Sequence, residues 1–429
     1  MATRAIGLLM LVLLGLSACA RFDPRPIDEV ALLERAKSRR EGALEVTAAV
    51  PTIAEARALY GVNLAAKQLQ PVWLEIRNET PQPQWLLMSG LDPEYYTPAE
   101  AAYAFRSAVA ASKTVAIEQH FQALEFRNPV GPGETVSGFV LVNLDEGVKA
   151  LDIDLLSRES FQAFTFIVPD PAFRADSAFV DFHALYRADE IVDYQSETEL
   201  RAALEALPCC TTNKKGTAQG DPLNLVLIGD ADDLFPAFVR RGWHPTEQTW
   251  SGAVWRTIKS FLAGTRYRYS PVSPLYAYGR PQDLAGQKAR ATIHERNHLR
   301  LWLSPMRFRG KDIWVGQISR DIGVRFTTKS PTISTHKIDP DVDEARDYLI
   351  QDLAYSQALA KLGYVSGVGA ASRSARRHNL TGDPYYTDGL RAVMVFEARP
   401  RALNDLDFFD DWEVPAVLEQ FGPRAVDED

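Results

Sequence analysis

A short apolar run at the start of the chain ends at a cysteine, and this arrangement fixes which residues are left to fold. Arg4 precedes an apolar stretch over residues 6–16, which is followed by two small residues and Cys19. A charged start, an apolar run of this length and small residues before a cleavage point are typical of a secretory signal peptide. The run is shorter than the roughly 20 apolar residues of a membrane-spanning helix. We therefore expect residues 1–18 to be removed, so that the mature chain begins at Cys19.

The sequence around Cys19 also predicts where the protein is held. Leu16-Ser17-Ala18-Cys19 resembles a bacterial lipobox, the motif at which the cysteine thiol is acylated. Two or more acyl chains hold a protein firmly on a bilayer, whereas one chain does so only marginally. The next residue is Ala20 rather than Asp, which resembles the sorting signal for the outer membrane. We expect a lipid-anchored protein on the periplasmic face of the bacterial outer membrane; the alternative is an ordinary secretory signal with a chance cysteine.

The bulk composition is that of a globular protein with room for more than one domain. The chain has 429 residues, of which 46% are hydrophobic and 24% are charged. At about 150 residues per domain, this length accommodates two or three domains. The formal net charge is −9. An acidic balance disfavours a nucleic-acid partner and gives no general attraction to anionic lipid, so we expect the membrane to be bound through the acyl chains.

Changes in composition divide the chain into segments. Residues 19–44 are polar and charged, which is typical of a tether, and residues 27–40 could form one helix within it. Alternating apolar and polar residues then predict a β-rich domain, which ends near Pro169 because X-Pro steps disfavour continued regular structure. The predicted order is a signal peptide at 1–18, a tether at 19–44, a sandwich-like domain at 45–169, a connecting segment at 170–220, a C-terminal domain at 221–402 and an acidic tail at 403–429.

Short alternating runs predict the strands of the first domain. Pro71–Asn78 alternates apolar and polar residues before a proline break. Several short strands separated by proline and glycine turns are typical of a β-sandwich. An alanine-rich stretch at 97–109, with Pro98 near its start, predicts a helix beside the sheets. The other predicted strands cover residues 84–88, 135–143, 148–156 and 162–168.

The later part of the chain mixes strand and helix patterns. Leu223–Gly229 is an apolar run typical of a buried strand, and Asp230 can cap a helix that runs to Arg241. The chain is thus predicted to be α+β, with an N-terminal sandwich-like domain followed by a mixed α/β domain. Further helices are predicted over residues 196–206, 249–262 and 339–363, and further strands over residues 298–303, 313–319 and 392–397.

Two adjacent cysteines remain once Cys19 is assigned to the lipid. The chain has three cysteines in all, and the other two are Cys209 and Cys210. Without further cysteines or spaced histidines, this pair defines no metal site. An oxidising compartment favours a disulfide, although bonded neighbours form a strained ring outside the usual Cα separation of roughly 4.4–6.8 Å. We expect a vicinal disulfide, with two buried thiols as the alternative.

Five short stretches between residues 208 and 400 resemble one known domain family, the LssY-like C-terminal domain family. In that family the domain follows membrane domains of the DedA and phosphatidic-acid-phosphatase types, whereas here a lipoprotein-like signal and a β-rich domain precede it. The resemblance implies a fold unit and an envelope setting, but no activity and no catalytic residue. The stretches that carry it are Pro208–Thr211, Asp221–Gly229, Gly279–Leu284, His298–Trp302 and His336–Asp343.

One set of polar residues supports a hypothesis about chemistry. His298 begins a predicted strand, His336 precedes an acidic helix start, and that start contains Asp339, Asp341 and Asp343. Imidazole and carboxylate ligands suit zinc or another divalent ion that activates water. No HExxH-type spacing fixes two ligands together, however. We favour the alternative, in which the aspartates begin a helix and each histidine forms a core hydrogen bond, so the cofactor and the catalytic residues stay unknown.

Other catalytic patterns are weaker. The turn at Asp230 has one glycine where a dinucleotide loop has three, and its carboxylate would repel phosphate. Ser366 is not in a Gly-x-Ser-x-Gly sequence, the motif of a nucleophile elbow. The basic run between Arg373 and His378 could meet anionic headgroups, but such runs are usually solvated loops.

Two classes of function therefore remain. The first is a non-catalytic envelope module that binds or braces an envelope protein or lipid. The second is a metal-assisted hydrolase that acts on a phospholipid or an envelope ester. We favour the first, because no spacing in the sequence fixes a catalytic set.

Overall fold

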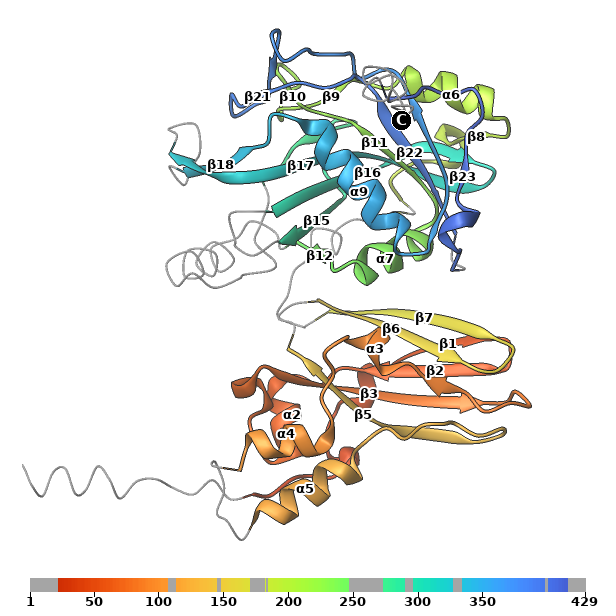
Figure 1. Cartoon of the computed structure of the whole chain (residues 1–429), viewed down its shortest axis with the longest axis vertical. Helices are drawn as coiled ribbons and strands as arrows, with labels where there is room; N and C mark the ends of the chain where they lie inside the picture. Colours follow the sequence, from red (N-terminus) through yellow and green to blue (C-terminus); the bar gives the residue numbers. More distant parts are fainter. Residues whose placement is uncertain are drawn as a thin grey trace, which may run out of the picture. The chain divides into compact units, whose positions relative to one another are not determined.

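The computed structural model divides the chain into two compact units, Met1–Asp170 and Pro171–Asp429 (Figure 1). Cys19 and the helix expected over residues 249–262 lie outside the described residues. No helix in the described part is both long and apolar enough to span a membrane. The structure describes residues 22–106, 113–144, 148–169, 182, 184–246, 273–289, 296–326, 334–397 and 400–415.

The first unit contains two antiparallel sheets that pack into a sandwich. Val46, Leu74 and Val140 of one sheet share a buried cluster with Ile153 and Phe164 of the other. The larger sheet has the order β1 (Lys37–Glu41), β2 (Leu44–Ala49), β3 (Leu69–Asn78) and β5 (Thr135–Asn143). The smaller sheet has the order β4 (Trp85–Leu86), β6 (Val148–Leu156) and β7 (Phe161–Pro169).

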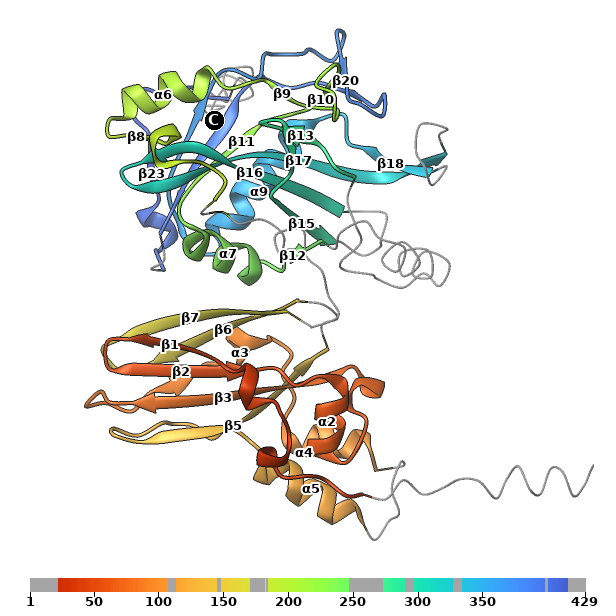
Figure 2. The same cartoon turned by 180° about the vertical axis from the view of Figure 1, so that it is seen from behind.

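Helices cover the outer face of the larger sheet, so β3 is buried on both sides. Leu74 points into the sandwich, whereas Trp73 joins a second cluster with Tyr60 and Phe121. Figures 1 and 2 show these helices together on that face. They are α2 (Ile53–Tyr60), α4 (Pro98–Ala104) and α5 (Thr114–Ala123), with the short η3 (Leu64–Lys67) beside them. The short α3 (Met88–Leu91) instead packs on β6 of the smaller sheet.

The expected tether is wrong as far as the structure describes it, because residues from Phe22 onward are folded. The helix expected over residues 27–40 is replaced by two short turns, η1 (Ile27–Glu29) and η2 (Leu33–Arg35), and by β1. Between the turns, Leu32 is fully buried. β1 pairs with β2 but keeps most of its side chains in solvent. A charged, exposed edge strand of this kind has the composition of a tether, which explains the error.

The second unit is organised around a mixed ten-stranded sheet. β11 runs parallel to β22 and antiparallel to β17, so the sheet is not of one type. Its main path is β12 (His244–Pro245), β15 (Leu284–Ala289), β16 (Arg296–Phe308), β17 (Lys311–Phe326), β11 (Leu225–Ile228), β22 (Arg391–Phe396), β19 (Leu359–Val365) and β23 (Asp407–Phe408), with β18 (Ser334–Ile338) on β17 and β8 (Val192–Tyr194) on β16.

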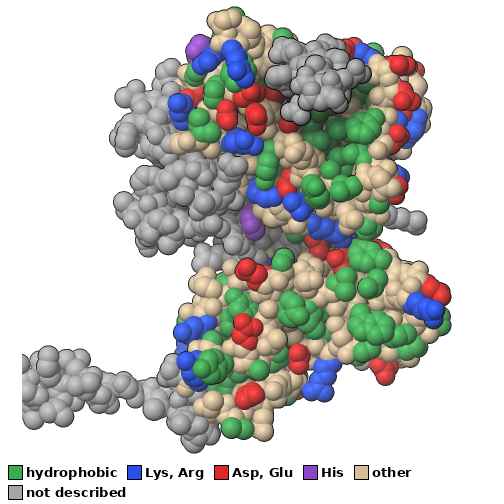
Figure 3. Space-filling model, viewed as in Figure 1, with side chains coloured by type: hydrophobic (Ala, Val, Ile, Leu, Met, Phe, Trp, Pro, Cys, Tyr) green, Lys and Arg blue, Asp and Glu red, His purple; other side chains and the backbone are tan. Residues whose placement is uncertain are grey.

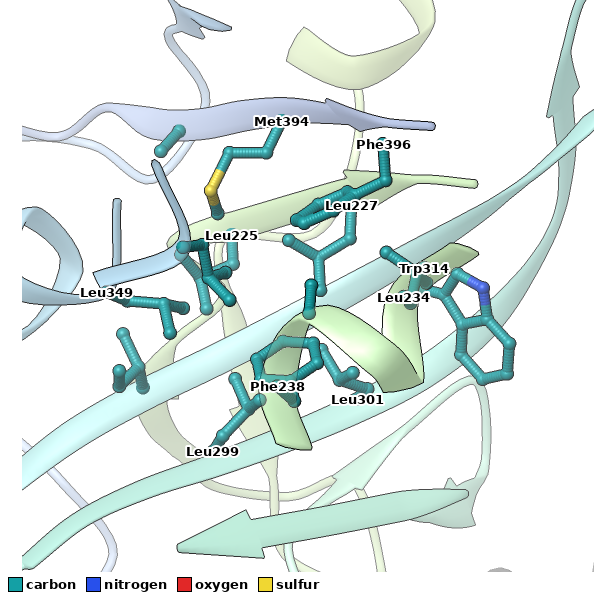
Figure 4. Packing of buried hydrophobic residues seen from close by; sticks show 14 of the residues in the cluster. Leu225, Leu227, Leu234, Phe238, Leu299, Leu301, Trp314, Leu349, Met394 and Phe396 are labelled. Carbon is teal, nitrogen blue, oxygen red and sulfur yellow. The ribbon is translucent and has the colours of Figure 1, made fainter. Parts of the chain in front are cut away.

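Helices lie on both faces of this sheet. Successive side chains of β11 point to opposite faces, and each set packs against different helices. Leu225 and Leu227 pack in a cluster with Leu234 and Phe238 of α7 (Ala231–Arg240) and with Leu349 of α9 (Val342–Ala354) (Figure 4). The intervening Val226 and Ile228 pack against Leu200 and Leu204 of α6 (Glu197–Glu205).

Two smaller sheets and two short turns complete the described part of the second unit. A four-stranded sheet has the order β10 (Gln219–Pro222), β9 (Cys210–Thr212), β13 (Tyr276–Ala277) and β14 (Arg280–Pro281). A two-stranded sheet joins β20 (Arg377–His378) and β21 (Pro384–Tyr385). Short 3-10 turns are η6 (Ala188–Glu190) and η7 (Leu403–Asp405). The chain is therefore α+β, as predicted.

Three expected boundaries in the second half need correction. The connecting segment at 170–220 contains β8, α6 and β9, whose hydrogen bonds and packing belong to the second unit. The helix expected to reach residue 363 ends at Ala354, because Gln357 adopts a left-handed conformation and residues 359–365 pair with β22 instead. Part of the acidic tail is also folded, since β23 pairs with β19 and Phe409 is buried.

Candidate functional site

A cavity of about 560 Å³ opens on the second unit, where β16, β17 and the start of α7 meet. Its volume lies within the range of roughly 300–1,000 Å³ that is usual for small-molecule sites. One wall is apolar and the rim carries charged side chains. The lining residues are Phe182, Tyr186, Ile191, Asp230, Ala231, Asp233, Leu303, Ser304, Met306, Arg307, Asp312 and Trp314.

The turn that joins β11 to α7 forms one side of the cavity. Trp314 Nε1 donates to the Gly229 carbonyl at 3.1 Å, and the Trp314 ring meets Phe182 edge-on with centroids 5.3 Å apart. Asp230 and Asp233 form a capping box at the start of α7. These contacts hold the indole and the helix start against each other, so the apolar wall is built into the fold rather than carried on a loop.

The three carboxylates at the rim of the cavity have different partners. Asp233 forms an ion pair with Lys311 at 2.5 Å, and Asp312 forms one with Arg307 at 2.8 Å. Exposed Asp230 instead accepts the backbone N–H of Asp312 at 3.4 Å. Within the described residues Asp230 has backbone partners rather than a basic side chain, so its carboxylate can pair with a cationic group at this end of the cavity.

A polar network supports the cavity from behind. Tyr186 donates its hydroxyl hydrogen to the Leu303 carbonyl at 2.8 Å and accepts from Arg280 at 2.8 Å. Arg280 also donates twice to buried Asp283, and burial raises the pKa of Tyr186. Asp283 in turn accepts the backbone N–H of Leu303. The Gly279–Leu284 motif therefore acts as a brace that fixes the cavity wall.

A second brace is the fully buried Arg391 of β22. Burial lowers the pKa of its guanidinium to about 10. A Cβ at position 367 would collide with the guanidinium, so Gly367 leaves the space that this side chain needs. Arg391 donates hydrogen bonds to the carbonyl oxygens of Leu204, Leu207, Pro208, Leu223 and Gly367, at 2.5 to 3.2 Å.

The adjacent cysteines lie next to this brace. In the structure Cys209 and Cys210 form a vicinal disulfide. Cys210 is buried and begins β9, where it pairs with Pro222 of β10. The bond therefore stiffens the chain where the loop after α6 enters β9, which suits a structural role.

The residues of the candidate metal site are held in different networks. The buried His298 faces Asp321 across β16 and β17, with Nε2 2.6 Å from the carboxylate oxygen. Asp339 accepts the backbone N–H of Asp341, which is the N-cap of α9. The side chain of His336 lies outside the described part of the structure. Within the described residues no group of three potential ligands comes together, and His298, Asp339 and Asp343 each have other partners there.

Asp343, the remaining member of that set, belongs to a buried arginine network. Its carboxylate accepts from Thr387 Oγ1 at 2.7 Å and from the backbone N–H of Asp388 at 2.6 Å. Arg346 is 1% exposed and donates to both carboxylate oxygens of Asp388, at 2.8 and 2.9 Å. Burial raises the pKa of Asp343 to about 6, against the opposing effect of Arg346. This network fastens α9 to the segment that precedes β22.

The basic run after β19 lies beside the same network. The guanidinium carbon of Arg373 is 5.0 Å from the centre of the Tyr386 ring, and Arg376 approaches the same ring at 5.7 Å. Arg377 donates to the Val368 carbonyl at 3.0 Å. Arg373 and Arg376 are exposed, which agrees with a solvated loop.

The cavity itself was not predicted from the sequence. Its lining comes from four separate segments, around residues 182–191, 230–233, 303–307 and 312–314. The only local signal was the strand–turn–helix pattern at Asp230, where the sequence disfavours a phosphate site because the carboxylate would repel the anion. The structure places an acidic and apolar cavity at that turn.

Comparison with known families identifies the second unit. Residues 201–390 match the family model described as LssY C-terminus. The chain therefore contains an LssY C-terminal domain, which confirms the resemblance stated for residues 208–400; the match begins in α6, before the domain start expected at residue 221. No curated protein matches the chain.

The shifted pKa of Asp343 predicts a pH effect on stability. Its pKa is about 6 in the folded protein and about 3.9 in an unfolded chain, so the folded state binds more protons between these values. The contribution of Asp343 to the free energy of unfolding therefore falls as the pH rises through this window. Asp343→Asn lacks this titration. The free energy of unfolding of the wild type minus that of the variant should be greater at pH 4 than at pH 7, by on the order of 2 kcal/mol.

Urea unfolding at both pH values measures this difference, and the exposed Asp405→Asn controls for an amide substitution as such. A difference that grows with pH would show that Asp343 is instead held ionised by Arg346.

The cysteine pair gives a second prediction. Protein purified without reductant should have an intact mass lower by about 2 Da per chain than the reduced protein, because disulfide formation removes two hydrogen atoms. Alkylation of both thiols in the native, unreduced protein would contradict the vicinal bond, as would a disulfide-linked dimer on a non-reducing gel.

Proposed function

We propose that this protein is a lipid-anchored envelope protein whose C-terminal domain is a binding module rather than a catalyst. The acyl chains on Cys19 hold it on the periplasmic face of the outer membrane. The observation that carries the anchoring is the lipobox-like Leu16–Cys19 placed directly after an apolar run of signal-peptide length.

The cavity supports binding as the role of the C-terminal domain. Its apolar wall, formed around Trp314 and Met306, suits a hydrocarbon or aromatic group. Asp230 at the rim suits a cationic or hydrogen-bond-donating group at the other end of the ligand. An amphipathic ligand with an apolar body and a cationic head combines both features. Such a ligand is available in an envelope, as part of a lipid or of a protein partner.

The hydrolase alternative has less support. A hydrolytic site needs a nucleophile or an activated water close to a base. At the cavity wall, Ser304 donates its hydroxyl hydrogen to the Ile313 carbonyl at 2.7 Å, so its oxygen is oriented by the strand. His298 is directed to Asp321, and Asp343 to Arg346 and its neighbours. These contacts favour structural roles for the residues that a hydrolase would use.

Anchoring is tested by replacing the acyl acceptor. Cys19→Ser should leave the precursor uncleaved or release the protein from the membrane fraction, because the serine hydroxyl does not take the place of the thiol in lipoprotein maturation. The measurement is fractionation of cells with intact-mass analysis of the product. A matched control is Ser17→Ala, which leaves the cysteine in place and should fractionate like the wild type. If Cys19→Ser is cleaved and still fractionates with membranes, the anchor lies elsewhere.

A further inference from the structure

The folded part of the chain begins very close to the proposed lipid. The ring of Phe22 lies 5.8 Å from that of His120 on α5, and it packs with the cluster that contains Leu59 and Phe121. Only three residue steps separate Cys19 from Phe22. At no more than about 3.6 Å per residue, this segment spans at most about 11 Å. An acylated Cys19 would therefore place the first unit directly against the bilayer rather than on a tether above it.

The surface beside Phe22 has the side chains that suit a membrane interface. Tyr103 on α4 and Val115 on α5 are each 63% exposed, and the two helices pack against each other. The guanidinium carbon of Arg106 lies 3.7 Å from the centre of the Tyr103 ring. Lys113, also exposed, is the N-cap of α5. Figure 3 shows hydrophobic and basic side chains side by side on this side of the unit.

These residue types fit the chemistry of lipid headgroups. Tyrosine is favoured at the boundary between headgroups and acyl chains, because its ring is apolar and its hydroxyl is polar. Arginine and lysine near the surface are attracted to anionic headgroups, by about 1 kcal/mol each. Val115 is five residues from His120 on α5, which at 1.5 Å per residue is about 7.5 Å along the helix. The surface is therefore within reach of a bilayer that passes close to Phe22.

We propose that the mature protein lies on the bilayer through the end of α4 and the start of α5, with Tyr103 and Val115 in the headgroup region and Arg106 and Lys113 on anionic headgroups. The inference rests on the proposed acylation of Cys19. The contact is confined to this end because Glu100 and Glu118 are exposed further along the same helices. The membrane thereby sets the orientation of the first unit as well as its location.

The same unit offers a matched control surface. Trp85, Leu156 and Phe161 are directly opposite one another on β4, β6 and β7, and all three are exposed. They belong to the smaller sheet, which these helices do not cover. Figures 1 and 2 show the turn between β6 and β7 at the end of the unit away from α5. If the unit adsorbed to membranes only through exposed apolar side chains, this row would contact the bilayer as readily as the α4–α5 surface.

Site-specific quenching tests the orientation. The full-length acylated protein is inserted into vesicles of phosphatidylethanolamine and phosphatidylglycerol that contain a headgroup spin label. Val115→Cys and Phe161→Cys each carry an environment-sensitive fluorophore, and the unsubstituted protein reports any labelling of Cys209 or Cys210. We expect quenching at position 115 to exceed that at position 161 by roughly twofold or more, because in this orientation only position 115 lies at the depth of the headgroups. Equal or stronger quenching at position 161 would overturn the proposal.

Charge reversal gives a second readout. Arg106→Glu combined with Lys113→Glu should lower the quenching at position 115, because attraction to phosphatidylglycerol is lost. Lys214→Glu with Lys215→Glu, on the second unit, should leave it unchanged. If both double substitutions lowered the quenching at position 115 equally, the assignment of the contact to this surface would be overturned. Intact-mass analysis separates the two levels of failure. An acylated protein that is not quenched at position 115 refutes only the orientation, whereas a protein without acyl mass refutes the anchoring and the orientation together.

Discussion

The second unit depends on the hydrogen bonds that the buried guanidinium of Arg391 donates to backbone carbonyls. Removing a charge from water costs several kcal/mol unless hydrogen bonds replace the lost hydration. Within the described structure, the replacement comes from backbone carbonyls at the end of α6, before the cysteine pair, before β11 and after β19. A shift of the segment at Leu204 or at Leu223 would leave a buried donor without its acceptor. A single side chain of β22 therefore joins three separate parts of the chain, at residues 204–208, 223 and 367.

The cavity depends on this arrangement through β11. Because Arg391 holds the residue that leads into β11, the strand delivers Gly229 and Asp230 to one place at its far end. Arg280 and Asp283 fix the opposite wall through the backbone at Leu303. The motifs that carry the family resemblance are thus mostly internal braces. They hold the shape of the cavity without themselves lining it.

Sequence patterns predicted strands and helices correctly where one face of the element, or the whole of it, is buried. The strand expected at 135–143 is β5, and the helix expected at 196–206 is α6, because alternation and capping are local signals. β1 was missed because an exposed edge strand is as charged as a tether. The helix–strand change after Ala354 was missed because it depends on pairing with β22. The cavity could not be predicted, since its wall combines segments more than 100 residues apart and its shape arises from tertiary packing.

Ligand-induced stabilisation of the full-length protein tests the binding role of the cavity most directly. A ligand that binds only the folded state raises the melting temperature. Octylammonium, which has an apolar chain and a cationic head, should raise it more than octanoate does. Asp230→Asn should abolish this difference without loss of the helix cap, because Asn caps as well as Asp, and Met306→Trp should do so by filling the cavity. Asp405→Asn, on the exposed surface of the same unit, should behave like the wild type. An equal or larger shift with octanoate would contradict the account, as would a preference for the amine that survives both cavity substitutions.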